Sequence, residues 1–322
     1  GYVIGLTDKP SYPVDKIKSI DSVVTGKVNV AKSMIKLAAW LKRHYGCTMN
    51  QALKTVIPVK DEVGHKQKKS VCLLVDTKKA QELISIYEKK AKAKYRLMCA
   101  LIDEEIVKDK LNISPATVKA LEADGIINVK VESYYRNPVS DKHIFNKKVV
   151  LNEEQQRAVD TIVEDYDNKA FNTYLIRGVT GSGKTEVYLD VIEHTINSGR
   201  QVIMLIPEIA LTFQTVQRFY HRFGDKVSII NSRMSKGERY DQFVRALKGE
   251  ISIMIGPRSA LFTQFPNLGL IVIDEEHEGA YISEQVPRYH AKDLAIHIAK
   301  EVGASVILGS ATPSIDSYYR AE

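Results

Sequence analysis

The sequence predicts an α/β fold with a parallel sheet over residues 151–322, preceded by two smaller domains. Three observations support this. Short apolar, β-prone runs alternate with helix-like stretches through this part of the chain. A glycine-rich turn at residues 178–185 joins the first such run to a helix-like stretch, and two polar motifs directly follow later runs. Because ligands of such sheets bind beyond the carboxyl ends of the strands, we expect these polar segments to lie at one edge.

The expected strands of this sheet are short and apolar, as buried strands usually are. They cover residues 173–176, 201–206, 226–230, 251–255, 268–273 and 305–308.

Charge is distributed unevenly along the 322 residues, whose net charge is +7. Residues 1–59 and 60–150 each carry a net charge of +6, whereas residues 151–322 carry −5. Such asymmetry predicts a nucleic-acid partner for the basic half. A solvated lysine-rich surface is the alternative.

The chain has no run apolar and long enough for a transmembrane helix, and no signal peptide is recognisable. It starts at Gly1 within an apolar run, so we expect it to begin inside a larger protein. The cysteines, Cys47, Cys72 and Cys99, fit neither a zinc-ligand spacing nor a disulfide framework. They indicate buried thiols in a reducing compartment, and therefore a cytoplasmic protein.

Residues 1–58 look like the C-terminal part of a small β-rich domain. Strands are expected at 2–6 and 19–24, and apolar periodicity predicts helices over 30–45 and 49–56. This is too little for a complete domain.

Residues 59–136 show the order of a winged helix-turn-helix domain. We expect a polar hairpin tip at 64–69, a strand at 70–76, helices at 93–102, 106–111 and 116–123, and a closing strand at 126–135. The third helix would be the recognition helix, and Lys119 is its one basic residue. Contact with DNA phosphates and docking to protein both remain open. A basic linker, 137–150, leads to the sheet domain.

The glycine-rich turn has the pattern of a phosphate-binding loop, Gly178-Val179-Thr180-Gly181-Ser182-Gly183-Lys184-Thr185. Its glycines let backbone N–H groups point toward a triphosphate, and the following helix contributes the positive end of its dipole. Lys184 can reach the β- and γ-phosphates, and the Thr185 hydroxyl can bind Mg²⁺. An ordinary glycine-rich turn is the alternative.

The expected strand at 268–273 runs directly into an acidic motif, Asp274-Glu275-Glu276-His277. Asp274 can hold the hydration shell of Mg²⁺ opposite Thr185, and Glu275 can orient and deprotonate an attacking water. His277 can couple this site to a neighbouring motif. A solvated acidic loop is the alternative, which the upstream phosphate-binding loop disfavours.

A third motif, Ser310-Ala311-Thr312, follows the last expected strand. Its hydroxyls can hydrogen-bond to the acidic motif and respond to the state of the nucleotide; a Ser/Thr turn is the alternative. Together, the three motifs resemble those of superfamily 2 helicases.

The resemblance narrows to the primosomal replication-restart helicases of superfamily 2. The segments that carry it are residues 151–155, 178–188, 206–212, 256–262, 274–277 and 309–313. It implies a RecA-like lobe over 151–322 that uses ATP and Mg²⁺, with Gln155 as the adenine contact. It also implies that residues 1–58 are part of a domain that binds the 3′ end of DNA.

The resemblance further implies contacts with DNA. Residues 280–291 are similar to an aromatic-rich loop that couples single-strand contact to ATP hydrolysis, although Ile282-Ser283 stand where the family has lysine and glutamine. Arg258 and Ser259 are candidates for contact with the DNA backbone. In the loop, the implied contact residues are Tyr281, Arg288, Tyr289 and His290.

As a member of this family, the chain would be part of an ATP-dependent 3′-to-5′ DNA helicase that binds stalled or abandoned replication forks and starts primosome assembly. The implied partners are forked or single-stranded DNA, primosome and helicase-loader proteins, and single-strand-binding protein; the protein would be a monomer with no membrane partner. The family also has a second lobe with an arginine finger and a cysteine-rich zinc-binding insertion, whose ligands are not found in this sequence. We therefore expect this chain alone to bind nucleotide, hydrolyse it slowly and not unwind DNA.

Two other functions remain open: a different superfamily 2 DNA translocase, and a DNA-binding regulator that nucleotide only switches. Glu275 and the Ser310-Ala311-Thr312 motif argue against the switch. A Glu275→Gln substitution discriminates, because a motor would lose DNA-stimulated hydrolysis whereas a switch would keep nucleotide-dependent affinity for DNA.

Overall fold

The computed structural model describes residues 6–10, 12–21, 32–57, 66–102, 106–107, 114–134 and 149–322. The chain divides into two compact units, Gly64–Arg136 and the remainder. The strand expected at 2–6 lies outside the described residues except for Leu6, as do part of the strand expected at 19–24 and most of the linker 137–150. Among the described helices, none combines the length and apolar character needed to cross a membrane.

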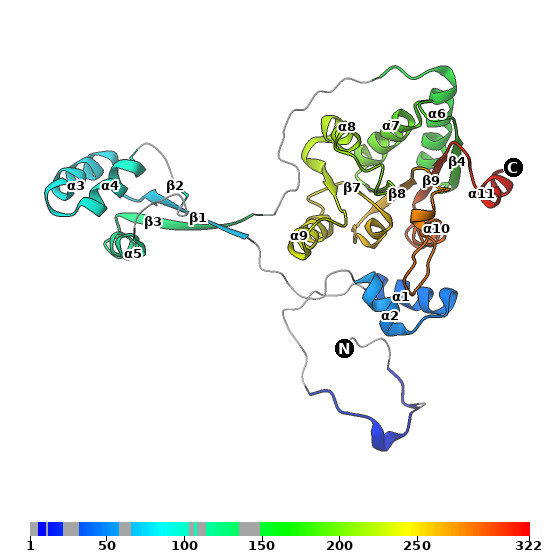
Figure 1. Ribbon diagram of the computed structural model, residues 1–322, viewed down its shortest axis with the longest axis horizontal. Helices are drawn as coiled ribbons and strands as arrows, with labels where there is room; N and C mark the ends of the chain where they lie inside the picture. The colour runs from blue at the N-terminus through cyan, green and yellow to red at the C-terminus, as the bar shows by residue number, and fades with distance from the viewer. Residues whose placement is uncertain are drawn as a thin grey trace. The chain divides into compact units, whose positions relative to one another are not determined.

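A six-stranded parallel sheet forms the centre of the larger unit, which confirms the α/β parallel-sheet part of the predicted fold class (Figure 1). Its strand order is β4-β9-β8-β5-β7-β6, and each pair of neighbours is parallel. The strand expected at 251–255 begins two residues later than predicted. The strands are β4 (Thr173–Arg177), β5 (Gln201–Leu205), β6 (Val227–Ile229), β7 (Ile253–Gly256), β8 (Leu268–Ile273) and β9 (Ser305–Ser310).

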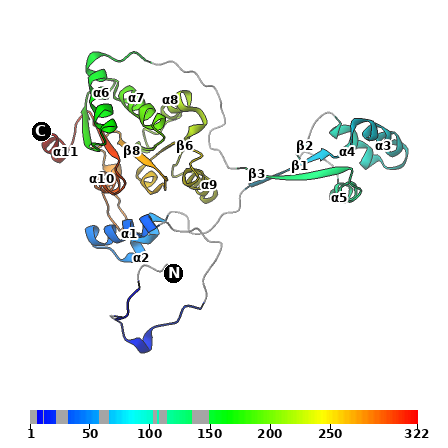
Figure 2. The ribbon, with the colours of Figure 1, turned by 180° about the vertical axis from the view of Figure 1, so that it is seen from behind.

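Helices cover both faces of this sheet (Figures 1 and 2). Alternate residues of a strand face opposite sides, so Val202 and Met204 pack in one apolar cluster while Ile203 and Leu205 pack in the other. The first cluster includes residues of α6 (Glu153–Asp167), α7 (Lys184–Asn197) and α8 (Phe213–Phe223). The second includes residues of α9 (Lys236–Leu247), α10 (Ala291–Val302) and the 3₁₀ helix η4 (Arg258–Phe262), and α11 (Ile315–Ala321) follows β9.

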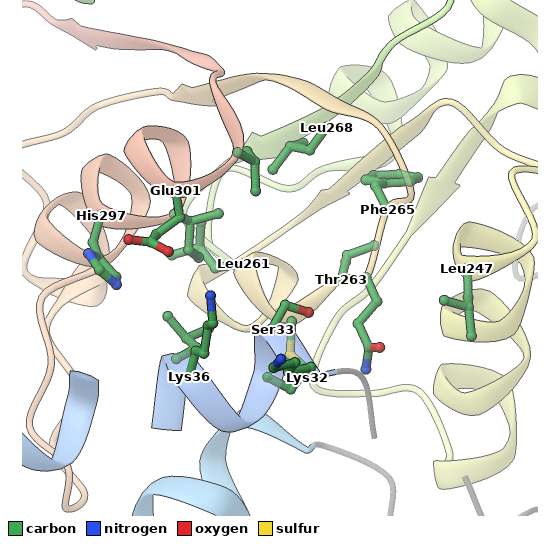
Figure 3. Close-up of a pocket in the computed structure, with 15 residues that line it drawn as sticks. Lys32, Ser33, Lys36, Leu247, Leu261, Thr263, Phe265, Leu268, His297 and Glu301 are labelled. Carbon is green, nitrogen blue, oxygen red and sulfur yellow. The ribbon is translucent and has the colours of Figure 1, made fainter. Parts of the chain in front are cut away.

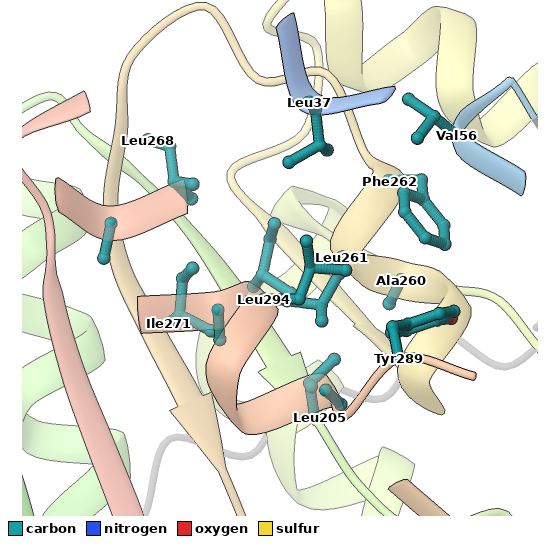
Figure 4. Packing of buried hydrophobic residues seen from close by; sticks show 14 of the residues in the cluster. Leu37, Val56, Leu205, Ala260, Leu261, Phe262, Leu268, Ile271, Tyr289 and Leu294 are labelled. Atoms are coloured by element: carbon teal, nitrogen blue, oxygen red, sulfur yellow. The ribbon is translucent and has the colours of Figure 1, made fainter. Parts of the chain in front are cut away.

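Two N-terminal helices share the second cluster. They are α1 (Lys32–Tyr45) and α2 (Met49–Val56), as the apolar periodicity predicts. Leu37 and Val56 pack in the same cluster as Phe262 and Tyr289 (Figure 4). The Trp40 ring stacks on His297 of α10, with 4.2 Å between ring centroids. Residues 32–57 are therefore physically part of the sheet domain's core.

Within its described residues, the smaller unit combines three helices with a three-stranded antiparallel sheet of order β2-β1-β3. Two predictions here are wrong. Residues 106–111 were expected to be helical, but Ile106 and Val107 pair with Val71 and Ser70 as a strand, which suits β-branched side chains. Residues 66–69 belong to a strand instead of a hairpin tip, and the first helix, α3, was not predicted. The elements are β1 (Lys66–Leu73), α3 (Thr77–Lys90), α4 (Lys92–Leu101), β2 (Ile106–Val107), α5 (Pro115–Ala123) and β3 (Ile127–Tyr134).

Candidate functional site

Three neighbouring strands bring the three polar motifs together. β4, β9 and β8 lie side by side and parallel, so their carboxyl ends meet at one edge of the sheet. Backbone hydrogen bonds join the segments that follow these strands. Gly178 N donates to Ser310 O at 3.1 Å, and Glu276 N donates to Gly309 O at 2.9 Å. The sequence predicts that the motifs share one edge of the sheet, but it does not predict that their strands are neighbours, because this depends on strand order.

The phosphate-binding loop has the backbone shape that its glycines allow. Gly181 and Gly183 have φ values of +81° and +83°, which side chains rarely tolerate. A Cβ on Gly178 would lie 2.5 Å from Ser182 Oγ. The loop passes directly into α7, which begins at Lys184. This combination of a tight loop and a helix N-terminus fits an anionic phosphate group.

The side chains of the phosphate-binding loop and of the start of α7 differ in exposure to solvent. Val179 and Thr180 are exposed, whereas Thr185, the second residue of α7, is half-buried. Lys184 is buried, and its Nζ donates to Gly178 O at 2.8 Å and lies 3.7 Å from Glu275 Oε1. The Lys184 ammonium therefore lies between the loop and the acidic motif.

Asp274 is half-buried, and its carboxylate accepts a hydrogen bond from a tyrosine of α7, the helix that follows the phosphate-binding loop. Tyr188, fully buried on α7, donates from its hydroxyl to Asp274 Oδ1 at 3.2 Å. Burial, followed by the charge of Glu275, raises the pKa of the Asp274 carboxyl, while the Tyr188 hydrogen bond and Lys184 act in the opposite direction. A divalent cation at this carboxylate would stabilise its charged form.

Glu275 and His277 face the third motif. Glu275 has a φ of +48°, a left-handed conformation that costs a non-glycine residue about 1–3 kcal/mol and is found most often at functional sites. Its Oε2 lies 3.7 Å from His277 Nδ1, which is 2.7 Å from Ser310 Oγ. Thr312 N donates to the same Ser310 oxygen at 3.1 Å. The residues expected to couple the two motifs are thus in contact, and the coupling itself stays a prediction.

Gln155 lies against the phosphate-binding loop. Its Nε2 donates to Ser182 O at 2.8 Å, and its Oε1 accepts from Asn152 N at 2.9 Å in a capping box at the start of α6. Both ends of the amide are therefore engaged, although Nε2 has a second hydrogen to donate. Adenine contact by Gln155 stays a prediction.

The segment expected to hold single-stranded DNA presents few aromatic faces. Tyr281 and Tyr289 are 1% and 3% exposed, so a base could stack on either ring only if the segment opened. The Tyr281 hydroxyl instead donates to Asp274 O at 2.7 Å. Burial raises the pKa of Tyr289 to about 12. Arg288 is exposed, and His290 caps α10 by accepting from Lys292 N.

The remaining candidate DNA contacts are Arg258 and Ser259 of the larger unit and Lys119 of the smaller unit. Arg258 donates from Nη1 to Ala280 O at 2.7 Å and Ile282 O at 3.0 Å, so it holds the backbone of the 280–291 segment. Ser259 is half-buried beside it, and Lys119 is exposed on α5 of the smaller unit. Contact of these residues with DNA stays a prediction.

A cavity of about 340 Å³ lies between α1 and the sheet domain, away from this chemistry (Figure 3). Lys36 and Ser33 of α1 line it together with His297 and Glu301 of α10. No residue of the phosphate-binding loop or the acidic motif lines it. The cavity is therefore not part of the site described above.

Sequence reasoning missed three buried residues around the site: Tyr188, Glu276 and Lys292. Tyr188 lies one helical turn after Lys184, a spacing that places both on one side of α7. Glu276 stands within the acidic motif but was given no role. Nothing in the local pattern of Lys292 predicts its burial.

The fold and the site define a P-loop lobe of the class that binds nucleoside triphosphates. The profile of the DEAD/DEAH box helicase family matches residues 152–321, which is more than half of the chain, and the chain belongs to this family. A profile of the 3′ DNA-binding domain of PriA matches residues 1–58. Use of ATP and Mg²⁺ follows from the family.

Comparison with individual proteins identifies the relatives of this chain within the helicase family. The replication restart protein PriA of Chlamydia muridarum is 37% identical over 315 residues, covering 95% of this chain and 42% of the relative. That of Haemophilus influenzae is 36% identical, covering 96% and 43%, and that of Bacillus subtilis is 45% identical, covering 66% and 27%. The chain is thus a homologue of PriA, and it spans less than half the length of these relatives.

Proposed function

We propose that this chain is part of an ATP-dependent 3′-to-5′ DNA helicase that recognises stalled or abandoned replication forks and starts primosome assembly. The observation that carries the proposal is the meeting of the phosphate-binding loop, Asp274-Glu275 and Ser310 at the ends of adjacent strands. The match of residues 1–58 to a 3′ DNA-binding domain supports DNA as the partner.

Each residue at this edge has a role that its geometry supports. The loop amides and Lys184 would bind the phosphates of the nucleotide, and Thr185 and Asp274 would hold Mg²⁺, which would supply positive charge to neutralise the phosphates. Tyr188 orients Asp274 through its hydroxyl. Glu275 accepts a proton from the attacking water, and His277 links that carboxylate to Ser310.

Contact with DNA is assigned to surfaces outside this edge. We assign residues 1–58 to the 3′-end-binding domain, whose helices α1 and α2 share a core with the sheet domain. We assign residues 59–136 to a winged-helix domain that offers Lys119 to phosphates. Residues 151–322 form the motor lobe, in which Arg258 contacts the 280–291 segment, Ser259 follows Arg258, and Arg288 is an exposed residue of that segment. The basic charge of residues 1–150 supports this division.

Further partners come from the resemblance to PriA. We propose that the protein acts as a cytoplasmic monomer with primosome and helicase-loader proteins and single-strand-binding protein. A second lobe with an arginine finger and a zinc-binding insertion would complete the motor.

Nucleotide binding by the 322-residue chain tests the site itself. We expect a fluorescent ATP analogue to bind in the presence of Mg²⁺, and Lys184→Ala to weaken binding by at least tenfold, because a charge-assisted contact with phosphate contributes about 1.5–3 kcal/mol. The control is Lys236→Ala, which removes an exposed lysine at the start of α9. Equal affinities of the two variants would refute the phosphate role of Lys184.

Hydrolysis tests the motor. In an extended chain that adds a second RecA-like lobe, Glu275→Gln should keep nucleotide affinity but abolish hydrolysis stimulated by single-stranded DNA. The 322-residue chain should hydrolyse ATP about 10³–10⁵-fold more slowly than the extended chain, because an arginine finger usually contributes a factor of this size. Nucleotide-dependent DNA affinity without any stimulated hydrolysis in the extended chain would favour the regulator instead.

A further inference from the structure

A buried ion pair joins the acidic motif to α10 behind the nucleotide site. Glu276 is 2% exposed and Lys292 is 7% exposed, and their Oε2 and Nζ atoms lie 3.5 Å apart. Neither residue has a role in the chemistry proposed above. Because buried charges are costly to desolvate, such a pair is not explained by stability alone.

The start of α11 completes the pair's hydrogen bonding. Glu276 Oε1 accepts from Ser314 N at 2.6 Å, and Oε2 accepts from Ser317 Oγ at 3.1 Å. Lys292 Nζ donates to Ser314 Oγ at 3.1 Å and to Ser317 Oγ at 2.8 Å. Four side chains from three segments therefore form one buried network.

Each of the three segments that form this network is close in sequence to a different part of the site. Glu276 directly follows Glu275, the expected water-activating residue. Ser314 lies two residues after Thr312, whose N–H bonds to Ser310. Lys292 directly follows Ala291, the last residue of the 280–291 segment.

The 280–291 segment is tied to the acidic motif by Tyr281, whose hydroxyl donates to Asp274 O at 2.7 Å. Its two arms pair through the bridge between Ile282 and His290 and through Ser283 N donating to Tyr289 O at 2.9 Å. A shift of these arms would displace Lys292, and Glu276 would have to follow or remain buried without its partner. Because breaking a buried ion pair leaves an uncompensated buried charge, the segments should move together.

We propose that Glu276 and Lys292 are a positioning pair that makes the 280–291 segment and the nucleotide site respond as one unit, so that single-stranded DNA at the segment changes nucleotide affinity. The proposal rests on the function proposed above. By linkage, nucleotide must change DNA affinity by the same factor.

The test measures this coupling factor in the 322-residue chain. The affinity of a fluorescent ATP analogue with Mg²⁺ is measured with and without an oligothymidylate, and DNA affinity with and without nucleotide. We expect the wild type to show coupling of about fivefold or more, the usual lower range for linked sites. The double variant Glu276→Gln, Lys292→Met leaves no unpaired charge, because Asp316, 3.6 Å from Lys292 Nζ, keeps its ion pair with Arg320. It should keep each separate affinity but reduce the factor to near one.

Two further variants separate positioning from stability. Lys292→Arg retains the charge and should keep most of the coupling. The control cluster is Arg222 with Asp190 and Glu193, which joins α8 to α7 in a partly buried contact away from this network. The variant Arg222→Met, Asp190→Asn, Glu193→Gln should lower thermal stability without changing the coupling factor.

Coupling that survives in the double variant would overturn the proposal. Absence of coupling in the wild type would also overturn it. In that case, nucleotide binding that is weakened by Lys184→Ala would still support the proposed function. If the double variant does not fold, amide exchange in the wild type decides. Nucleotide should change exchange at residues 289–294 and 314–318 together, and a response confined to one segment would refute the pair's role.

Discussion

At the scale of single residues, the nucleotide site depends on close packing beneath it as much as on its polar groups. The Tyr188 hydroxyl reaches Asp274 across the backbone of Gly309, and a Cβ on Gly309 would lie 1.5 Å from that hydroxyl. Only glycine leaves room for this hydrogen bond. The glycine before the Ser310 motif is therefore required by the tyrosine beneath it.

Gly309→Ala should force Tyr188 from its place. We expect a loss of about 1–3 kcal/mol in the free energy of unfolding, the usual cost of overpacking, together with weaker Mg²⁺-dependent nucleotide binding. Urea denaturation and nucleotide titration with and without EDTA would measure the two effects. Gly279→Ala is the control, because no atom lies within 4 Å of its added Cβ. Equal unfolding free energies and nucleotide affinities of the two variants would contradict the packing argument.

At the scale of elements, α1 belongs to the core of the sheet domain although a separate unit intervenes in the sequence. Leu41 is fully buried in this core, and Trp40, the single tryptophan of the chain, stacks on His297. Tyr45 adds a polar contact by accepting a hydrogen bond from His290 N at 3.2 Å.

Leu41→Ala should destabilise the sheet domain as well as the helix. We expect a loss of about 2–5 kcal/mol, because the truncation leaves a cavity in a shared core. Trp40 fluorescence reports α1 and circular dichroism reports the whole fold, so both transitions should shift together in denaturant. Leu247→Ala, at a half-exposed position, should cost less. A tryptophan transition that shifts alone would show that α1 unfolds independently.

The strongly patterned elements could be predicted from the sequence, and the weakly patterned ones could not. The strand that enters the phosphate-binding loop is apolar and bounded by turns, and α2 carries a Thr48–Gln51 capping box. By contrast, β2 is only two residues long, and it is set by pairing with β1 instead of by any local pattern. The contacts of Lys292 and Tyr45 likewise depend on tertiary packing that no window of sequence contains.

At the scale of the whole molecule, the smaller unit has a core of its own. Leu97, Val118 and Leu121 are buried there together with Val71 of the sheet, and all cluster members fall within residues 64–136. A unit whose apolar contacts are internal can fold without the rest of the chain.

Residues 64–136, expressed separately, should therefore fold alone. We expect helical circular dichroism and a cooperative thermal transition that matches one of two transitions of the 322-residue chain. Calorimetry of both proteins would check this. A separate fragment without a cooperative transition would show that the smaller unit depends on the larger one.

The strand order also has a consequence for how the protein is made. Strand β4, which holds the phosphate-binding loop, pairs in the sheet with β9 alone, and β9 ends at Ser310. A nascent chain therefore carries the complete loop sequence well before the strand that fixes the loop in place has been synthesised. At about 5–20 residues per second, the interval is on the order of 10 s. During that time the ribosome-bound chain contains the nucleotide-binding motif without a formed nucleotide site.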